Sequence, residues 1–113
     1  MITTKNVNED KYLLYALTQS AVGGSLSDHV EEVLDVEAFA LYERVDQETG
    51  EMKKAFSMIT PEGEIYGTGS PAFCDTFENK ILSVFEPDEI KRLKIVEKTS
   101  KQGRTYIQPV PMR

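Results

Sequence analysis

The feature that most constrains the fold is a single helix signal that stands between strand patterns. Ser70 is a favoured N-cap residue, and Pro71 suits the first helical position. Apolar side chains then recur at helical spacing up to about residue 85, at Phe73, Phe77, Ile81, Val84 and Phe85. Pro87 breaks this pattern, and residues 87–90 predict a short extra turn. One helix with one apolar stripe is expected to cover the core of a sheet that the rest of the chain supplies.

Strand patterns lie on both sides of this helix, at residues 11–18, 33–45, 52–59, 64–68, 93–98 and 104–108. Residues 11–18 also fit a helical face, but their length and two tyrosines favour a strand. Neither alternating face of residues 33–45 is uniformly apolar, which predicts a bulge that exchanges the faces midway. Pro109 and Pro111 are expected to end the last strand, because proline has no N–H for the sheet ladder.

The order of these elements indicates the fold class. Turn residues occupy 46–51, 60–63 and 99–103, and residues 19–32 form a longer loop around Gly23-Gly24. A helix between the third and fourth main strands is the OB-fold arrangement. We therefore predict a mainly β, OB-fold-like five-stranded barrel with one capping helix at about residues 70–85. The 113 residues suit one domain, which we place at 10–109, between a flexible tail at 1–9 and a short tail at 110–113.

Catalytic and metal-binding motifs find no support in the sequence. Cys74 and His29 are the only residues of their types, so a zinc site would have only two such ligands. A Cys74–His29 nucleophile pair competes with a simpler interpretation, in which the cysteine is buried on the helix and the histidine lies on a loop. No P-loop, G-x-S-x-G or H-E-x-x-H pattern occurs. We expect a protein without enzymatic activity, cofactor or bound metal.

The sequence also shows no stretch typical of a membrane span or a secretory signal. No apolar run approaches the roughly 18–20 residues of a membrane span, and the first residues do not resemble a secretory signal. A lone thiol fits a reducing compartment. The expectation is a cytoplasmic protein without membrane contact.

Charge is distributed unevenly along the chain, whose formal net charge is −6. Residues 91–113 contain seven cations and one anion, whereas residues 1–90 contain six cations and eighteen anions. A basic C-terminal segment in an acidic chain predicts contact with a polyanion there. It is equally consistent with a lysine-rich hairpin that protects a sheet edge from aggregation.

Binding of single-stranded DNA requires cations along the phosphates and aromatic faces on which bases stack. Alternation places Tyr42 beside Arg44, and Tyr106 would lie among cations if its face coincides with that of Lys94 and Lys98. For each ring the alternative is a half-buried tyrosine with a hydrated hydroxyl. The candidate nucleic-acid-binding residues are Tyr42, Arg44, Lys53, Lys54, Tyr66, Lys94, Lys98, Lys101, Arg104 and Tyr106.

Three stretches carry a family resemblance: DVEAFALY at 35–42, TPEGEIY at 60–66 and LKIVEKTSKQGR at 93–104. The last contains the pattern V-x-x-T-S-x-x-G. In order and spacing they resemble the single-stranded-DNA-binding proteins of small protein-primed tailed phages of Gram-positive bacteria, over about residues 11–108. The resemblance implies that Tyr42 and Tyr66 stack on bases. A further family tyrosine, in the hairpin loop after the strand of Tyr42, has no counterpart in residues 46–50.

Two functions from different classes follow. The first is a protein that binds and protects single-stranded DNA, with little sequence preference, during phage DNA replication. The alternative is a phage-encoded interaction module, an inhibitor or adaptor of a host protein, that works through the acidic surface of residues 1–90. The expected partner is single-stranded DNA, while self-association and contacts with replication proteins stay open.

Overall fold

Two β-sheets enclose the main core of the protein. The computed structural model describes residues 3–7, 10–19 and 24–113. Its strands are β1 Thr3–Lys5, β2 Gly24–Ser25, β3 Val33–Asp35, β4 Ala38–Val45, β5 Met52–Ile59, β6 Ile65–Thr68, β7 Arg92–Thr99 and β8 Thr105–Met112. Its helical segments are α1 Lys11–Gln19, α2 Pro71–Thr76 and short turns at Leu26–His29, Phe77–Ile81 and Pro87–Glu89. The predicted mainly β class is confirmed.

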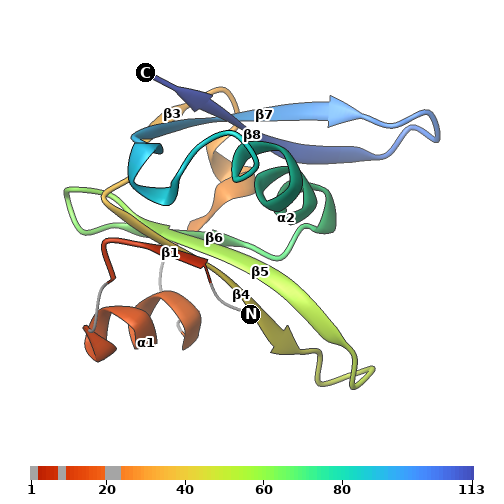
Figure 1. Cartoon of the computed structure of the whole chain (residues 1–113). Coiled ribbons are helices and arrows are strands. Elements are labelled where there is room, and N and C mark those ends of the chain that lie inside the picture. The colour runs from red at the N-terminus through yellow and green to blue at the C-terminus, as the bar shows by residue number, and fades with distance from the viewer. Residues whose placement is uncertain (1–2, 8–9, 20–23) are drawn as a thin grey trace.

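The sheets differ in size and together replace the closed barrel that we predicted. The larger sheet has the order β1-β4-β5-β6-β2, and the smaller one has the order β3-β7-β8. All pairs are antiparallel except β2 with β6. In Figure 1 the smaller sheet lies above the larger one, α2 lies between them, and α1 lies below. The described strands thus form two facing sheets instead of one closed five-stranded barrel.

The core between the sheets is built from phenylalanine side chains. Phe39 of β4 and Phe56 of β5 meet the helix residues Phe73 and Phe77, and all four are fully buried. The Phe77 ring lies 5.0 Å from that of Phe39 and 4.6 Å from that of Phe56, between centroids. Aromatic rings at these separations add to the stabilisation from burial alone. The capping role predicted for the helix is therefore confirmed.

The helix begins as predicted and ends earlier. The Ser70 hydroxyl accepts a hydrogen bond from the Phe73 N–H at 3.3 Å, and Pro71 occupies the first turn. A π-helical turn continues α2 from Phe77 to Ile81. Val84 lies beyond this turn and is 73% exposed, so it is not part of the buried stripe.

Residues 11–19 form α1, so the strand predicted at 11–18 is wrong. The Asp10 carboxylate accepts hydrogen bonds from the N–H groups of Tyr12 and Leu13, which caps the first turn. Leu17 is buried against Ala40 and Ala55 on the lower face of the larger sheet. The apolar face of 11–18 fits both periods, and the small residues on this sheet face leave room for a helix.

The single bulged strand predicted at 33–45 is two strands in different sheets. The chain leaves β3 after Asp35 and enters β4 at Ala38. Between them the Val36 N–H donates to the Lys91 carbonyl at 2.9 Å, and the Glu37 N–H donates to the Ile59 carbonyl at 3.0 Å. The change of faces seen in the sequence is thus a crossing from one sheet to the other.

Parts of both predicted tails belong to the sheets, while residues 1–2 and 8–9 of the first lie outside the described residues. Residues 3–5 form the edge strand β1, paired with β4, and Val7 is buried. At the other end β8 runs through Pro109 and Pro111 to Met112 instead of stopping before them. β8 is an edge strand, where a proline nitrogen that faces away from the neighbouring strand costs no ladder hydrogen bond.

Cys74 provides a chemical test of this packing. Its side chain is fully buried on α2, and burial raises the pKa of the thiol to about 11. Because thiolate is the reactive form, we expect a thiol reagent to leave native Cys74 unmodified and to react at once in denaturant. Rapid modification of the native protein, followed by mass spectrometry, would contradict the described core.

Candidate nucleic-acid interface

The C-terminal strands extend beyond the body of the protein as a hairpin. β3 pairs with β7 only as far as Val33 opposite Lys94, whereas β7 and β8 pair along their whole length. We call residues 96–108 the projecting hairpin, and Figure 1 shows it leaving the body on the side away from the β5–β6 turn. Its outer part therefore has two strands without sheet neighbours.

Residues 100–104 hold the tip of the projecting hairpin in a defined turn. The Ser100 N–H donates to the Arg104 carbonyl at 2.8 Å, and the Gly103 N–H donates to the Ser100 carbonyl at 2.9 Å. Gly103 has φ +82°, a left-handed conformation that favours glycine. This turn fixes where Lys101 and Arg104 leave the backbone.

The register puts the two hairpin faces, whose coincidence the sequence left open, on the same side of the smaller sheet. Lys98 of β7 lies directly opposite Tyr106 of β8, and Val96 lies opposite Gln108. Side chains of opposed residues in an antiparallel pair share a face and have Cβ atoms about 5 Å apart. Tyr106 is half-buried and has Lys98 as its direct neighbour on the outer face of the smaller sheet.

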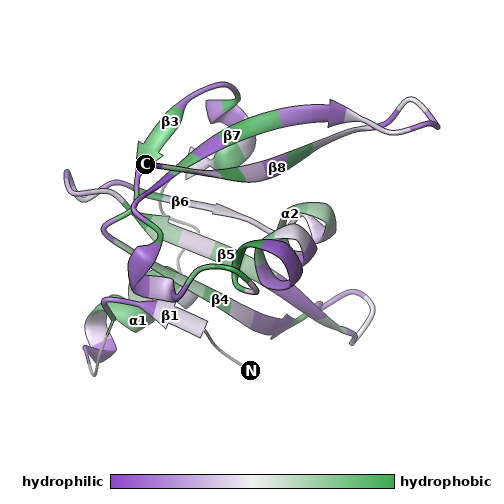
Figure 2. Cartoon of the chain, turned by 45° about the horizontal axis from the view of Figure 1, so that its top comes forward, coloured by the Kyte–Doolittle hydropathy of each residue, from purple (hydrophilic) through white to green (hydrophobic). Residues whose placement is uncertain are grey.

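The cations near the tip of the projecting hairpin and those nearer the body differ in whether they form ion pairs. Lys94 lies 3.4 Å from the Glu31 carboxylate, and Arg92 lies 2.9 Å from that of Asp35. The exposed tip cations are Lys98, Lys101 and Arg104, and none of them forms an ion pair within residues 3–7, 10–19 and 24–113. Figure 2 shows the outer half of β7 as hydrophilic. These three cations are available to phosphates.

An aliphatic patch on the same outer face escaped the sequence analysis. Val33 and Val110 flank Lys94 on its two sides, and Met112 lies opposite Arg92. The exposed fractions of the two valines are 47% and 37%, and that of Met112 is 40%. Alternation beyond Gln108 would have revealed this patch, but we expected the prolines to end the strand there.

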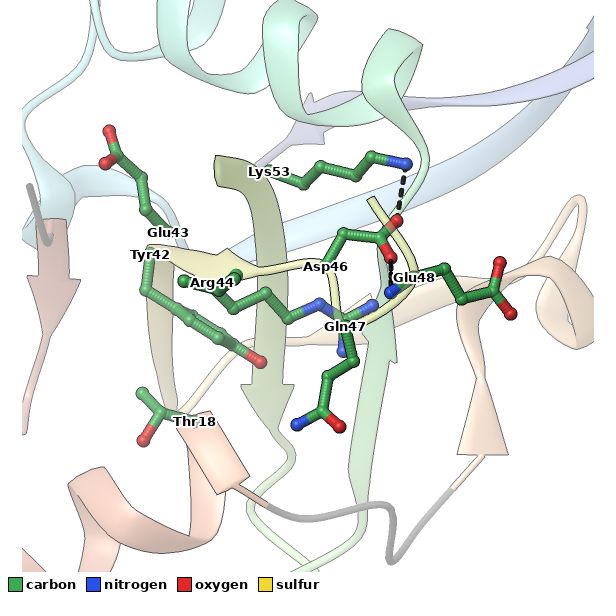
Figure 3. Close-up of a pocket in the computed structure, with 9 residues that line it drawn as sticks. Thr18, Tyr42, Glu43, Arg44, Asp46, Gln47, Glu48 and Lys53 are labelled. Carbon is green, nitrogen blue, oxygen red and sulfur yellow. Dashed lines mark hydrogen bonds and ion pairs between the residues drawn. The ribbon is translucent and has the colours of Figure 1, made fainter. Parts of the chain in front are cut away.

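Tyr42 and Arg44 line a different hollow, of about 800 Å³, beside the end of α1. Figure 3 shows both side chains on one side of β4, with the Tyr42 ring directed toward Thr18. The ring is only 8% exposed because it packs with Leu17 in the core below the larger sheet. The accessible Tyr42 that the sequence predicted is therefore not found, and its role in base stacking stays a prediction.

Charged residues of both signs line this hollow. Glu43, Asp46 and Glu48 line it together with the two cations Arg44 and Lys53. The Lys53 ammonium lies 2.7 Å from the Asp46 carboxylate (Figure 3), and this contact lowers the pKa of Asp46. The Glu43 side chain points to the other side of β4 (Figure 3), so two acids and two cations face the hollow, and this balance of charge makes it a poor surface for phosphates.

Lys54 and Tyr66 also have partners within the protein. The Lys54 ammonium lies 2.5 Å from the Glu78 carboxylate, which raises the pKa of the lysine. The Tyr66 ring is half-buried, with its centroid 4.2 Å from that of His29. Its hydroxyl donates to Glu64, which raises the pKa of the tyrosine. Both side chains already have a carboxylate partner within the protein, and their roles in DNA binding stay predictions.

No group of three or more potential metal ligands occurs in the part of the chain that the structure describes. In the same part, no helix is long and apolar enough to cross a membrane.

Comparison with known proteins indicates which kind of partner the projecting hairpin is suited to bind. A family model described as phage single-stranded DNA-binding protein matches residues 3–108. This chain belongs to that family. No curated protein and no solved structure matches the chain. In this phage single-stranded DNA-binding protein, the match covers the whole projecting hairpin, and the alternative of an acidic interaction module is not favoured.

Proposed function

We propose that the protein binds and protects single-stranded DNA, with little sequence preference, during phage DNA replication in the host cytoplasm. It acts by binding and not by catalysis. The proposal is supported most directly by one observation: Tyr106 lies opposite Lys98, next to a turn with two more cations, and none of the three cations has an ion pair among the described residues. A stacking ring beside phosphate-binding cations is the combination that sequence-tolerant binding requires.

The side chains on the projecting hairpin also favour a single strand over a duplex. A tyrosine ring stacks only on a base whose face is open, and bases in a duplex are stacked on each other. Lys98, Lys101 and Arg104 neutralise phosphates whatever the base. Val33, Val110 and Met112 extend the same face with aliphatic surface for unstacked bases. Bound strands would thereby be kept from pairing and from nucleases.

Tyr106→Ala is the direct test of the stacking role. We expect it to weaken binding of a mixed-sequence oligonucleotide by about 1–3 kcal/mol, the usual cost of losing one stacked base. Tyr106→Phe should retain most of the affinity, because the ring and not the hydroxyl supplies the contact. Fluorescence anisotropy with a labelled oligonucleotide measures both.

The matched control for this test is Tyr12→Ala. Tyr12 is 90% exposed on α1, far from the projecting hairpin (Figure 1), so its removal should leave the affinity unchanged. Equal affinities of Tyr106→Ala and the unchanged protein would remove Tyr106 from the interface.

A further inference from the structure

A groove lies between the projecting hairpin and the start of α2, on the side of β8 where Ile107 faces the core, and it extends around this edge strand to Tyr106. It has a volume of about 620 Å³ and is formed by the hairpin, the end of β6 and the first turn of α2. Pro71, Ala72 and Ile107 supply apolar wall, and Tyr106 and Arg104 contribute from the hairpin. Cavities of this size hold small planar ligands. The groove is thus open to a base from a strand that the hairpin cations hold.

Hydroxyl groups in this groove have protons to donate. The Thr68 hydroxyl oxygen accepts the N–H of Ser70 at 3.1 Å, and the Ser70 oxygen accepts that of Phe73 at 3.3 Å. The Ser100 oxygen accepts the N–H of Arg104 at 3.2 Å. Each hydroxyl carries one donor proton in addition to its acceptor sites, and these bonds use only acceptor sites. The walls therefore offer donors to carbonyl oxygens and ring nitrogens of a base.

Glu97 is the anionic acceptor in the groove. It lies opposite Ile107 and on the same face of β7 as buried Ile95, which directs its side chain inward. No cation of residues 3–7, 10–19 and 24–113 pairs with its carboxylate. A carboxylate repels phosphate, so the groove is unsuited to the DNA backbone. It suits the N–H groups on the edge of a base.

We propose that this groove binds the Watson–Crick edge of one base and that Glu97 accepts a hydrogen bond from an exocyclic amino group. Cytosine presents an N4 amino donor, for which glutamate is a known partner. Uracil and thymine present a carbonyl oxygen at the same position, whose lone pairs face the carboxylate. The protein therefore prefers cytosine over uracil or thymine at one position of the bound strand. This inference rests on the proposed function and adds a modest base preference to it.

The test compares two oligonucleotides of equal length, one of deoxycytidine and one of deoxyuridine, above neutral pH. They differ only at the Watson–Crick edge, so stacking area and backbone charge are matched. We expect the unchanged protein to bind the cytosine strand about fivefold more tightly, as one hydrogen bond to a partly solvated carboxylate allows. In Glu97→Gln the ratio should fall to about one, because the amide also donates to a carbonyl oxygen.

Glu62→Gln is the matched control, since Glu62 is exposed on the β5–β6 turn, outside the groove. Each change removes one negative charge, and Glu62→Gln should not weaken binding to either strand. The control should keep the fivefold ratio. Equal binding of both strands by the unchanged protein, or a ratio that survives Glu97→Gln, overturns the inference alone. Absence of binding to both strands at low salt overturns the proposed function instead.

Discussion

Replacing Lys98, Lys101 and Arg104 together with alanine is expected to weaken binding of single-stranded DNA about 100-fold at 0.1 M salt. Each phosphate contact releases counterions and contributes about 0.7 to the slope of log affinity against log salt. Three contacts therefore contribute a slope of about 2, which corresponds to two decades of affinity at this salt concentration. The three cations are exposed and unpaired within the described part of the chain, so their loss should leave the fold intact.

The decisive measurement is the salt slope, from titrations at several salt concentrations. A control triple variant at Lys11, Lys80 and Lys91 removes the same charge from exposed positions outside the projecting hairpin. It should change the affinity through net charge alone and keep most of the slope. If the control variant loses the slope and the hairpin variant keeps it, phosphates bind elsewhere on the protein.

Lys5→Ala is expected to reduce the free energy of unfolding by about 3 kcal/mol. Lys5 is 5% exposed, and its ammonium donates to the carbonyl oxygens of Val36 at 2.6 Å and Ile90 at 2.8 Å. Both carbonyls belong to buried residues and would lose this donor. An unsatisfied buried acceptor costs roughly 1–3 kcal/mol. The single side chain ties β1 to the crossing between the sheets and to the turn before β7.

Urea unfolding of three variants separates the contributions. Lys5→Met retains the apolar stem and loses only the ammonium, so it should recover part of the loss in Lys5→Ala. Lys11→Ala removes an exposed lysine of the same chain region and should stay within about 0.5 kcal/mol of the unchanged protein. An unfolding midpoint for Lys5→Ala equal to that of the unchanged protein would show that the two carbonyls need no donor.

The same lysine predicts a dependence of stability on pH. Burial, and to a smaller degree the charge of Lys91, lower the pKa of Lys5 from its usual 10.5, against the opposing charges of Glu37 and Asp88. Between the lowered pKa and 10.5 the unfolded chain holds more protons than the folded one, so stability rises with pH there. The stability of the unchanged protein relative to Lys5→Met should therefore increase as the pH approaches 10.5. A difference that is flat or falls would contradict the buried ammonium.

The sequence predicts an element correctly where the residues that determine it lie within one short segment. The strand at 52–59 and the start of α2 at Ser70-Pro71 were predicted with the bounds that the structure has. Turn residues predicted the hairpin tip at 99–103, and alternation placed Lys94 with Lys98 and Arg104 with Tyr106, but only the register of the two strands puts Lys98 and Tyr106 on one face. In each case the deciding interactions lie within a few residues of each other.

The predicted secondary structure is wrong where contacts with a distant segment determine it. Residues 11–18 have side chains for a strand or a helix, and the alanines of β4 and β5 favour the helix. Residues 33–45 divide between two sheets because Val36 and Glu37 find backbone partners at Lys91 and Ile59. Neither partner can be identified from the segment itself.

For the candidate site, too, the sequence determines some properties and the tertiary structure determines others. The amino-acid order alone establishes the basic C-terminal hairpin, its tyrosine and the family resemblance, since charge and alternation are properties of a short stretch. Whether a ring is accessible depends on what packs over it: α1 buries Tyr42, whereas Tyr106, on an edge strand beside α2, is only half-buried. The groove of Glu97 likewise exists only because α2 and the projecting hairpin, which residues 77–95 separate in the sequence, are held together by the core between the two sheets.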